Sequence, residues 1–240
     1  MNRVSIILFF FLLCLAPSIA YTNENAETLF KQQKYQEALD LWTNELKQGK
    51  QNDALHYNIG LAHLKLNQFP QSILHLEIAL KLNPNCKPCL AALQLANQNA
   101  EIEEFKMPEY SISKWYQYIM NSLNSILWLA LASFFFSIAI LIYFKKSTLS
   151  KLQWICIVAG ILFLLFAIHR EYNITKIDKV VVLDGKGLFQ SPDQSSEVKI
   201  QLNKGSVLKI KDQLGDWLKV ETNSYESGWI ETKNISFIKL

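Results

Sequence analysis

Charge is missing from two long stretches of this sequence. Residues 115–144 and 152–168 contain no Lys, Arg, Asp or Glu, and only seven residues separate them. A membrane-spanning helix needs about 20 apolar residues, with a range of about 17–25. A helix in the core of a soluble protein rarely stays apolar on every side for this length. The absence of charge therefore argues against two buried soluble helices and predicts a membrane hairpin.

Acidic residues are also absent from the loop between the two stretches. This loop, residues 145–151, carries Lys145, Lys146 and Lys151. Short loops rich in lysine stay on the cytoplasmic side of a membrane. The sequence predicts spans at residues 122–144 and 152–169, a cytoplasmic loop at 145–151, and flanking regions that both lie outside the cytoplasm.

The first 20 residues predict a signal peptide. Arg3 precedes an apolar run at residues 4–15, and Ser18-Ile-Ala20 has the small-x-small pattern of a cleavage site. Cleavage would leave Tyr21 as the first residue, and an uncleaved anchor is the alternative. Both place the following residues outside the cytoplasm.

Cysteine is scarce, with four residues in the chain. Cys14 lies in the signal peptide and Cys156 in the second span, which leaves Cys86 and Cys89 on the outer side. The Cys-x-Pro-Cys pattern at a helix start has three open interpretations: a disulfide that pins a turn, a redox switch, or two packed thiols. The surrounding βαβ pattern of thioredoxin-like enzymes is missing, and no His follows Cys89 as c-type haem attachment requires.

A strong charge of one sign is missing too. The net charge is +3, and much of the excess lies in the loop and beside the spans. This distribution encodes membrane topology and excludes nucleic acid as a partner. His56, His63 and His75 are spread over helices with no carboxylate or thiol at metal-ligand spacing. We therefore expect no enzyme activity, no metal and no cofactor.

A period of 34 residues is present before the hairpin. The segment 35–39 recurs as 69–73, and Ala26 recurs as Gly60. Small residues at this spacing are typical of paired helices that cross closely. The pattern resembles the tetratricopeptide repeat (TPR). The resemblance implies an all-α TPR helical repeat over residues 21–106, with repeats at about 21–52 and 53–86, a closing helix at 88–104 and a linker at 107–121.

The resemblance also implies a shallow partner-binding groove along the first helix of each repeat. The residues at groove positions are Asn23, Glu27, Phe30, Lys31, Tyr57, Asn58, Leu61 and Lys65. Each of them is also explained as a packed or solvated residue, because repeat proteins bind through a distributed surface. Glu27 occupies a position where a clamp for chaperone C-terminal carboxylates needs Lys or Asn, so that clamp is absent.

After a second linker at residues 170–178, the region 179–240 changes to short β-rich runs. Gly and Pro turns separate these runs, which predicts a small all-β barrel. Three segments follow in order: Leu202-Asn-Lys-Gly205, Gly215-Asp-Trp217-Leu-Lys-Val220 and Gly228-Trp229-Ile230. They resemble the bacterial SH3 domain. The resemblance makes Trp217 and Trp229 candidates for a ligand surface, with packing as the alternative.

The predicted fold class is thus a multidomain membrane protein with a TPR helical repeat, a transmembrane helical hairpin and a small SH3-like barrel. This order resembles the BatE family, the repeat proteins of the Bacteroides aerotolerance operon. The resemblance implies a two-pass protein of the bacterial inner membrane whose soluble domains are periplasmic. It also implies a scaffold in oxygen or envelope-stress tolerance, working with membrane proteins that carry von Willebrand factor A domains and with an AAA+ ATPase system.

Two other functions stay open. The SH3-like domain would allow binding to the cell wall through peptidoglycan. Cys86 and Cys89 would allow a role as a thiol redox component.

Overall fold

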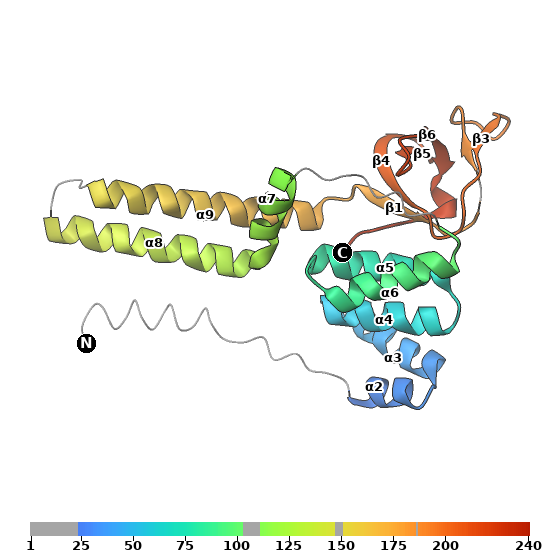
Figure 1. Cartoon of the computed structure of the whole chain (residues 1–240), viewed down its shortest axis with the longest axis horizontal. Coiled ribbons are helices and arrows are strands. Elements are labelled where there is room, and N and C mark those ends of the chain that lie inside the picture. The colour runs from blue at the N-terminus through green and yellow to red at the C-terminus, as the bar shows by residue number, and fades with distance from the viewer. Residues whose placement is uncertain (1–23, 103–110, 147–150, 186) are drawn as a thin grey trace. The chain divides into compact units, whose positions relative to one another are not determined.

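The computed structural model describes residues 24–102, 111–146, 151–185 and 187–240 (Figure 1). The predicted signal peptide, Asn23 and residues 147–150 of the predicted loop lie outside the described residues. The described residues form two compact units. One contains residues 111–173, and the other contains residues 24–102 together with 174–240.

Paired antiparallel helices build the repeat region. Their bounds are α2 Glu24–Lys31, α3 Tyr35–Lys47, α4 Asp53–Lys65, α5 Phe69–Leu82 and α6 Lys87–Asn99. A Cβ on Gly60 would lie 2.8 Å from Cγ of Leu76, and the hydroxyl of Ser72 donates to the carbonyl of Gly60 at 2.8 Å. Gly60 and Ser72, two small residues of the 34-residue period, therefore lie where α4 and α5 cross.

The turn that ends each first helix repeats with the same period. Gln33, Asn67 and Glu101 all have a positive φ, between 55° and 64°. After each of them, the next amide donates to a carbonyl five residues earlier, as in the Schellman motif: Lys34 to Leu29, Gln68 to His63, and Ile102 to Asn97. The turn at Glu101 shows that the end of α6 keeps the turn geometry of the two preceding repeats.

The C-terminal region is an antiparallel sheet of seven strands in the order β3-β2-β6-β5-β4-β1-β7. The strands are β1 Lys179–Val182, β2 Leu188–Phe189, β3 Val198–Ile200, β4 Val207–Leu214, β5 Trp217–Glu221, β6 Ser227–Glu231 and β7 Ile235–Phe237. Alternate residues face its core, which includes Val180, Val182, Leu208, Leu218 and Ile230. A 3₁₀ turn, Thr232–Asn234, connects β6 to β7.

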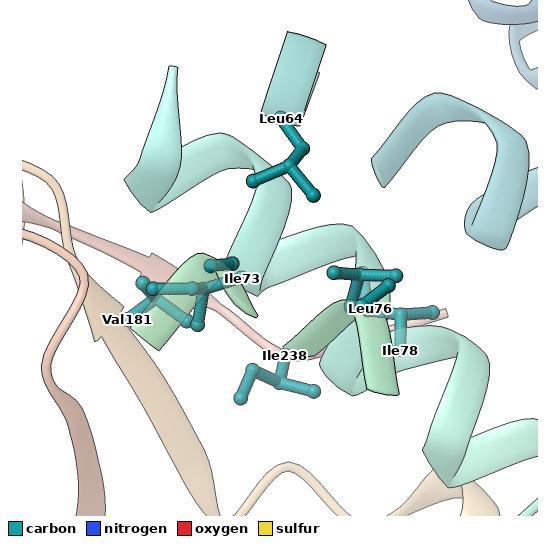
Figure 2. Close-up of a cluster of buried hydrophobic side chains, with 8 residues drawn as sticks. Leu64, Ile73, Leu76, Ile78, Val181 and Ile238 are labelled. Carbon is teal, nitrogen blue, oxygen red and sulfur yellow. The ribbon is translucent and has the colours of Figure 1, made fainter. Parts of the chain in front are cut away.

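Strand β1 is buried on both faces. Val180 and Val182 point into the barrel, whereas Val181 belongs to a second cluster with Ile73 and Leu76 of α5 and with Ile238 (Figure 2). Val181 and Ile73 have no exposed surface. The repeats and the barrel therefore share one hydrophobic cluster, which includes Ile73, Leu76, Val181 and Ile238 and which we call the junction.

Polar contacts surround the junction. The side-chain amide of Asn203 donates to the carbonyl of Glu101 at 2.7 Å, and Lys179 pairs with Glu77 at 3.4 Å. The ammonium of Lys81 donates to the carbonyl of Ile238 at 3.1 Å. These contacts join α5 and the end of the third-repeat turn to segments about a hundred or more residues later in the chain.

Three helices make up the other unit: α7 Ser111–Ser122, α8 Ser125–Lys146 and α9 Lys151–Thr175. Helix α7 covers most of the segment 107–121 that was expected to be a linker and ends one residue beyond it. The side chain of Asn124 accepts from the amide of Leu127 at 2.8 Å and caps α8, which separates α7 from α8. Helix α9 extends to Thr175, through much of the second expected linker.

The two long helices pack through small and aromatic residues. A Cβ on Gly160 would lie 3.0 Å from the ring of Phe136, and the ring of Trp128 stacks against that of Phe163 at 5.7 Å. Both helices are long and apolar enough to cross a membrane. Only 17% and 22% of their apolar windows are buried, which is unlike the core helices of a soluble protein.

Candidate interaction surfaces

The first helices of the repeats carry the predicted groove residues. Lys31 and Lys65 are exposed, and Glu27 and Asn58 are half-buried. These four side chains lie on α2 and α4. They comprise two positively charged groups, one negatively charged group and one amide. They give the groove face a mixed polar character.

Three of the predicted groove residues also take part in packing. Phe30 contacts the ring of Tyr35 edge-on at 5.1 Å and lies 5.7 Å from the ring of Trp42. Tyr57 and Leu61 pack against the junction core. Both are half-buried, so part of each side chain remains available at the surface.

The two tryptophans of the barrel lie on the outer face of its sheet. Leu218 and Ile230 point inward, so their neighbours Trp217 and Trp229 point outward, and both are half-buried. Phe189 pairs with Trp229 across the strands, and its ring meets that of Trp217 edge-on at 5.4 Å. We call Phe189, Trp217 and Trp229 the aromatic patch.

Phe189 was not among the predicted ligand residues. The strand motif that contains the two tryptophans points to these residues alone, and Phe189 lies about 30 residues earlier. Its two-residue strand β2 gives no periodic signal, although Leu188 has no exposed surface and Phe189 is half-buried on the opposite side. The pairing of β2 with β6 is what brings Phe189 to the tryptophans.

Three histidines that are spread along the sequence form one stack. The ring of His75 on α5 stacks with that of His56 at 5.3 Å and with that of His63 at 5.6 Å. The Nδ1 atoms of His56 and His75 are 3.1 Å apart, at hydrogen-bond distance. The stack joins α4 to α5 within the second repeat.

Burial keeps this stack neutral. Loss of hydration lowers the pKa of His56 to about 4 and that of His75 to about 3. In His75 the nearby His56 and His63 add a smaller lowering effect. Burial also lowers the pKa of His63, against a hydrogen bond to Gln68 that raises it. Within the described residues, no group of three or more His, Cys, Asp or Glu could hold a metal ion.

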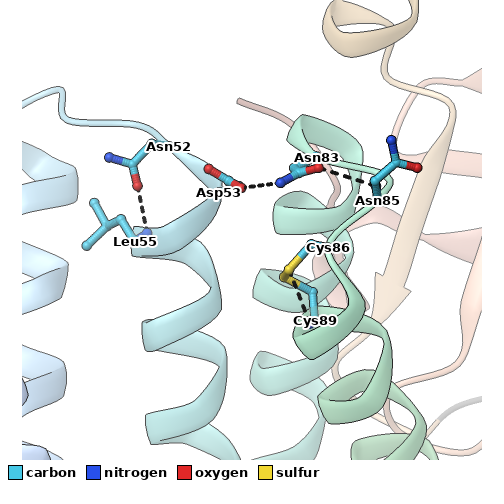
Figure 3. Close-up of a disulfide and its surroundings, with 7 residues drawn as sticks. All are labelled: Asn52, Asp53, Leu55, Asn83, Asn85, Cys86 and Cys89. Carbon is cyan, nitrogen blue, oxygen red and sulfur yellow. Dashed lines mark hydrogen bonds between the residues drawn. A yellow bond between two sulfur atoms is a disulfide. The ribbon is translucent and has the colours of Figure 1, made fainter. Parts of the chain in front are cut away.

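Cys86 and Cys89 stand at the start of α6. Their sulfur atoms are bonded at 1.96 Å, and their Cα atoms are 5.3 Å apart (Figure 3). Cys86 is half-buried, whereas Cys89 has no exposed surface. Cys156, the free cysteine of the described residues, is buried in α9.

Two shallow hollows lie beside the junction. One, of about 350 Å³, is lined by Glu101 and Ile102 from the repeats and by the turn 222–226 of the barrel. The other, of about 440 Å³, is lined by Phe69, Pro70, Asn203 and others. Both are open and lined by polar as well as apolar atoms, so they extend the exposed surface that the repeats and the barrel present together.

Comparison with protein families agrees with both soluble regions. Residues 53–86 match the family model of the tetratricopeptide repeat, and residues 187–236 match that of the bacterial SH3 domain. No curated protein and no solved structure matches the chain.

The predicted fold class is confirmed: a helical repeat of the TPR type, two apolar helices and an SH3-like antiparallel sheet. Domains of these two types are typically non-catalytic. They mediate contacts between proteins or with the cell wall. The two apolar helices are compatible with a membrane protein.

Proposed function

We propose that this protein is an adaptor of the bacterial inner membrane, anchored by the hairpin α8–α9, with the repeats and the barrel facing the periplasm. The observation that carries the proposal is the junction. A hydrophobic core shared by Ile73, Val181 and Ile238 requires residues before and after the hairpin to lie on the same side of the membrane. Two crossings satisfy this requirement, and a single crossing does not.

One feature of the sequence and one of the structure support the periplasmic side. The loop 145–151 carries lysines without acidic residues, which favours the cytoplasm for the loop and the opposite side for both ends. A disulfide between Cys86 and Cys89 fits an oxidising compartment.

Helix α7 supports membrane attachment at the outer end of the hairpin. Trp115, Tyr116 and Tyr118 expose 66%, 41% and 70% of their surfaces directly before the first span. Trp and Tyr side chains favour the boundary between lipid and water because one end is apolar and the other polar. The ring of Tyr116 meets that of His169 edge-on at 5.9 Å, at the point where α9 becomes polar.

The partners that we propose are membrane proteins with von Willebrand factor A domains, linked to an AAA+ ATPase, in a Bat-type complex for tolerance of oxygen or envelope stress. The order of the modules supports this proposal through its resemblance to the BatE family. The mixed polar groove of the repeats and the aromatic patch of the barrel give the protein two surfaces for contacts with other proteins.

Photo-crosslinking in living cells tests the adaptor role. A crosslinking amino acid at Lys31 or Lys65, on the groove face, should trap a membrane protein. The same amino acid at Lys47, which is exposed on the second helix of the first repeat, serves as the matched control. Equal or absent crosslinking from the groove positions would count against the proposal.

Reporter fusions test the topology. A fusion at Lys151 should report the cytoplasm, and a fusion after Leu240 should report the periplasm. The same side for both fusions would overturn the two-span arrangement.

The aromatic patch favours peptidoglycan binding as a second candidate. Half-buried aromatic rings at an outer sheet face offer flat apolar surfaces with polar surroundings, as saccharide-containing ligands require. The full chain in detergent should sediment with purified sacculi, and Trp217→Ala with Trp229→Ala should abolish this. Tyr225→Ala, in the exposed β5–β6 turn, is the control that should leave sedimentation unchanged.

A further inference from the structure

The cysteine pair occupies the N-terminal end of a full helix. Cys86 is the N-cap of α6, a helix of 13 residues, and the backbone amide of Cys89 donates to Sγ of Cys86 at 3.2 Å. Helix N-termini favour negative charge because their backbone N–H groups point outward. After reduction, the same amide would stabilise a thiolate on Cys86, and the adjacent Lys87 would favour it further.

The two sulfur atoms differ in access. Cys86 is half-buried, whereas Cys89 has no exposed surface. An attacking thiolate must approach a disulfide sulfur directly, and Cys86 is the residue of the pair that has exposed surface. The structure thus defines an attacked sulfur, on Cys86, and a leaving sulfur, on Cys89.

The turn that carries the pair is held by other bonds as well. The side chain of Asn83 donates to Asp53 at 2.7 Å and accepts from the amide of Asn85 at 3.3 Å (Figure 3). The amide of Leu90 donates to the carbonyl of Cys86 at 3.1 Å. Because the disulfide closes a loop of only a few residues, it adds less constraint than a bond across a long loop. We therefore expect the turn to keep its shape when the disulfide is reduced.

We propose that Cys86 and Cys89 form a thiol–disulfide exchange centre that oxidises a dithiol of a partner protein. This step goes beyond adaptor function, although it rests on the proposed position outside the cytoplasm. It gives the adaptor a chemical reaction to perform on the proteins that it gathers.

The exchange proceeds in two balanced steps. A partner thiolate attacks Sγ of Cys86, the bond to Cys89 breaks, and Cys89 leaves as a thiolate that takes up a proton. The second thiolate of the partner then attacks its own sulfur in the mixed disulfide and releases Cys86 as a thiolate. The partner gains a disulfide, and Cys86 and Cys89 gain two electrons and become a dithiol.

The first test asks whether the folded protein exchanges its disulfide. It uses the full chain in detergent with Cys14→Ser and Cys156→Ala, so that only the pair remains, and treats it with dithiothreitol or reduced glutathione. Maleimide mass tags count the thiols, and circular dichroism follows the fold. We expect two free thiols in a protein that stays folded. Reduction only under conditions that unfold the repeats would overturn the proposal.

The second test separates the roles of the two sulfurs. In a Cys89→Ser variant, the free Cys86 should react with iodoacetamide at pH 7 at least about tenfold faster than the free Cys89 of a Cys86→Ser variant, because access and thiolate fraction both favour it. The Cys89→Ser variant should also form a mixed disulfide with glutathione. Equal rates, or faster reaction of Cys89, would contradict the assignment.

A control distinguishes this proposal from the adaptor role. In the double variant Cys86→Ser, Cys89→Ser, groove crosslinking at Lys65 should be unchanged, while oxidation of the crosslinked partner's thiols should be lost. Unchanged partner oxidation would overturn the exchange centre and leave the adaptor role intact.

Discussion

At Gly205, the backbone conformation and the neighbouring side chains both require a residue without a Cβ. Its φ is +94°, and an added Cβ would lie 2.7 Å from Cδ1 of Ile73 and 3.1 Å from Cδ1 of Ile102. We predict that Gly205→Ala lowers the free energy of unfolding by about 1 kcal/mol through backbone strain. Crowding at the junction should add about 1–3 kcal/mol. Urea unfolding of the full chain in detergent measures the total.

Gly49 supplies the matched control for this substitution. Its φ is +84°, and nothing lies within 4 Å of the position of its Cβ. Gly49→Ala should therefore cost only the backbone part. If Gly205→Ala and Gly49→Ala lose equal stability, the added methyl group at Gly205 does not clash with Ile73.

The histidine stack predicts a pH dependence of stability. In the unfolded chain, each imidazole has a pKa near 6.5, whereas in the fold burial lowers the pKa of His56 to about 4 and that of His75 to about 3. The unfolded state therefore binds more protons between these values. The contribution of these two histidines to stability is therefore fully present above about pH 6.5. As the pH drops below this value, the free energy of unfolding falls by up to about 1.4 kcal/mol per pH unit for each histidine.

Urea unfolding at a series of pH values between 7 and 4 measures this effect. A double variant, His56→Leu with His75→Leu, removes both groups, and its stability should fall less steeply over the same range. An unchanged slope in the variant would assign the pH dependence to other groups.

Helices α8 and α9 pack closely against each other at Gly160. Because a Cβ there would lie 3.0 Å from the ring of Phe136, Gly160→Leu should force the two helices apart. We expect loss of the folded hairpin in detergent at a lower temperature than for the wild type. Val158→Leu, at a position with 61% exposure, adds apolar volume on the outer side and should have little effect. Similar melting of the two variants would contradict the packing.

Most helices and strands are predictable from the sequence, because their signals depend on residues that are close together along the chain. The 34-residue period marks the crossing at Gly60, and uncharged length marks α8 and α9, because both signals depend on neighbours along the chain. Helix α7 was missed because its short segment, 111–122, precedes a longer apolar run that dominates the pattern. The unbroken run Val180–Val182 departs from alternation and is explained by burial on both faces of β1.

The sites were less predictable than the elements. The groove and the tryptophans followed from family resemblance, and they stay predictions. The histidine stack joins His56 on α4 to His75 on α5, 19 positions later, and Phe189 reaches the tryptophans only through strand pairing. Both depend on tertiary packing, which spacing along the sequence does not reveal.

At the scale of the whole soluble unit, the junction predicts that the repeats and the barrel unfold together. Val181→Asp places a charge at a fully buried position between them and should cost about 3 kcal/mol or more. Hydrogen exchange should accelerate in the amides of α5 as well as in those of β4 and β5.

Val198→Asp provides the comparison, since Val198 on β3 is 41% exposed. It should leave exchange in α5 unchanged. Faster exchange confined to the barrel in the Val181 variant would mean that the two regions are stable independently.

The contact between Lys81 and Ile238 joins residues 157 positions apart, with the whole hairpin between them. In the proposed two-span arrangement, the apolar side of α5 therefore stays uncovered during synthesis until both spans have entered the bilayer and the later strands lie on the same side as the repeats. Closure of this core would then mark the insertion of both spans. A chain in which only one of the two spans inserts would keep Ile73 and Leu76 exposed, and such exposed apolar surface makes a protein a target for proteases.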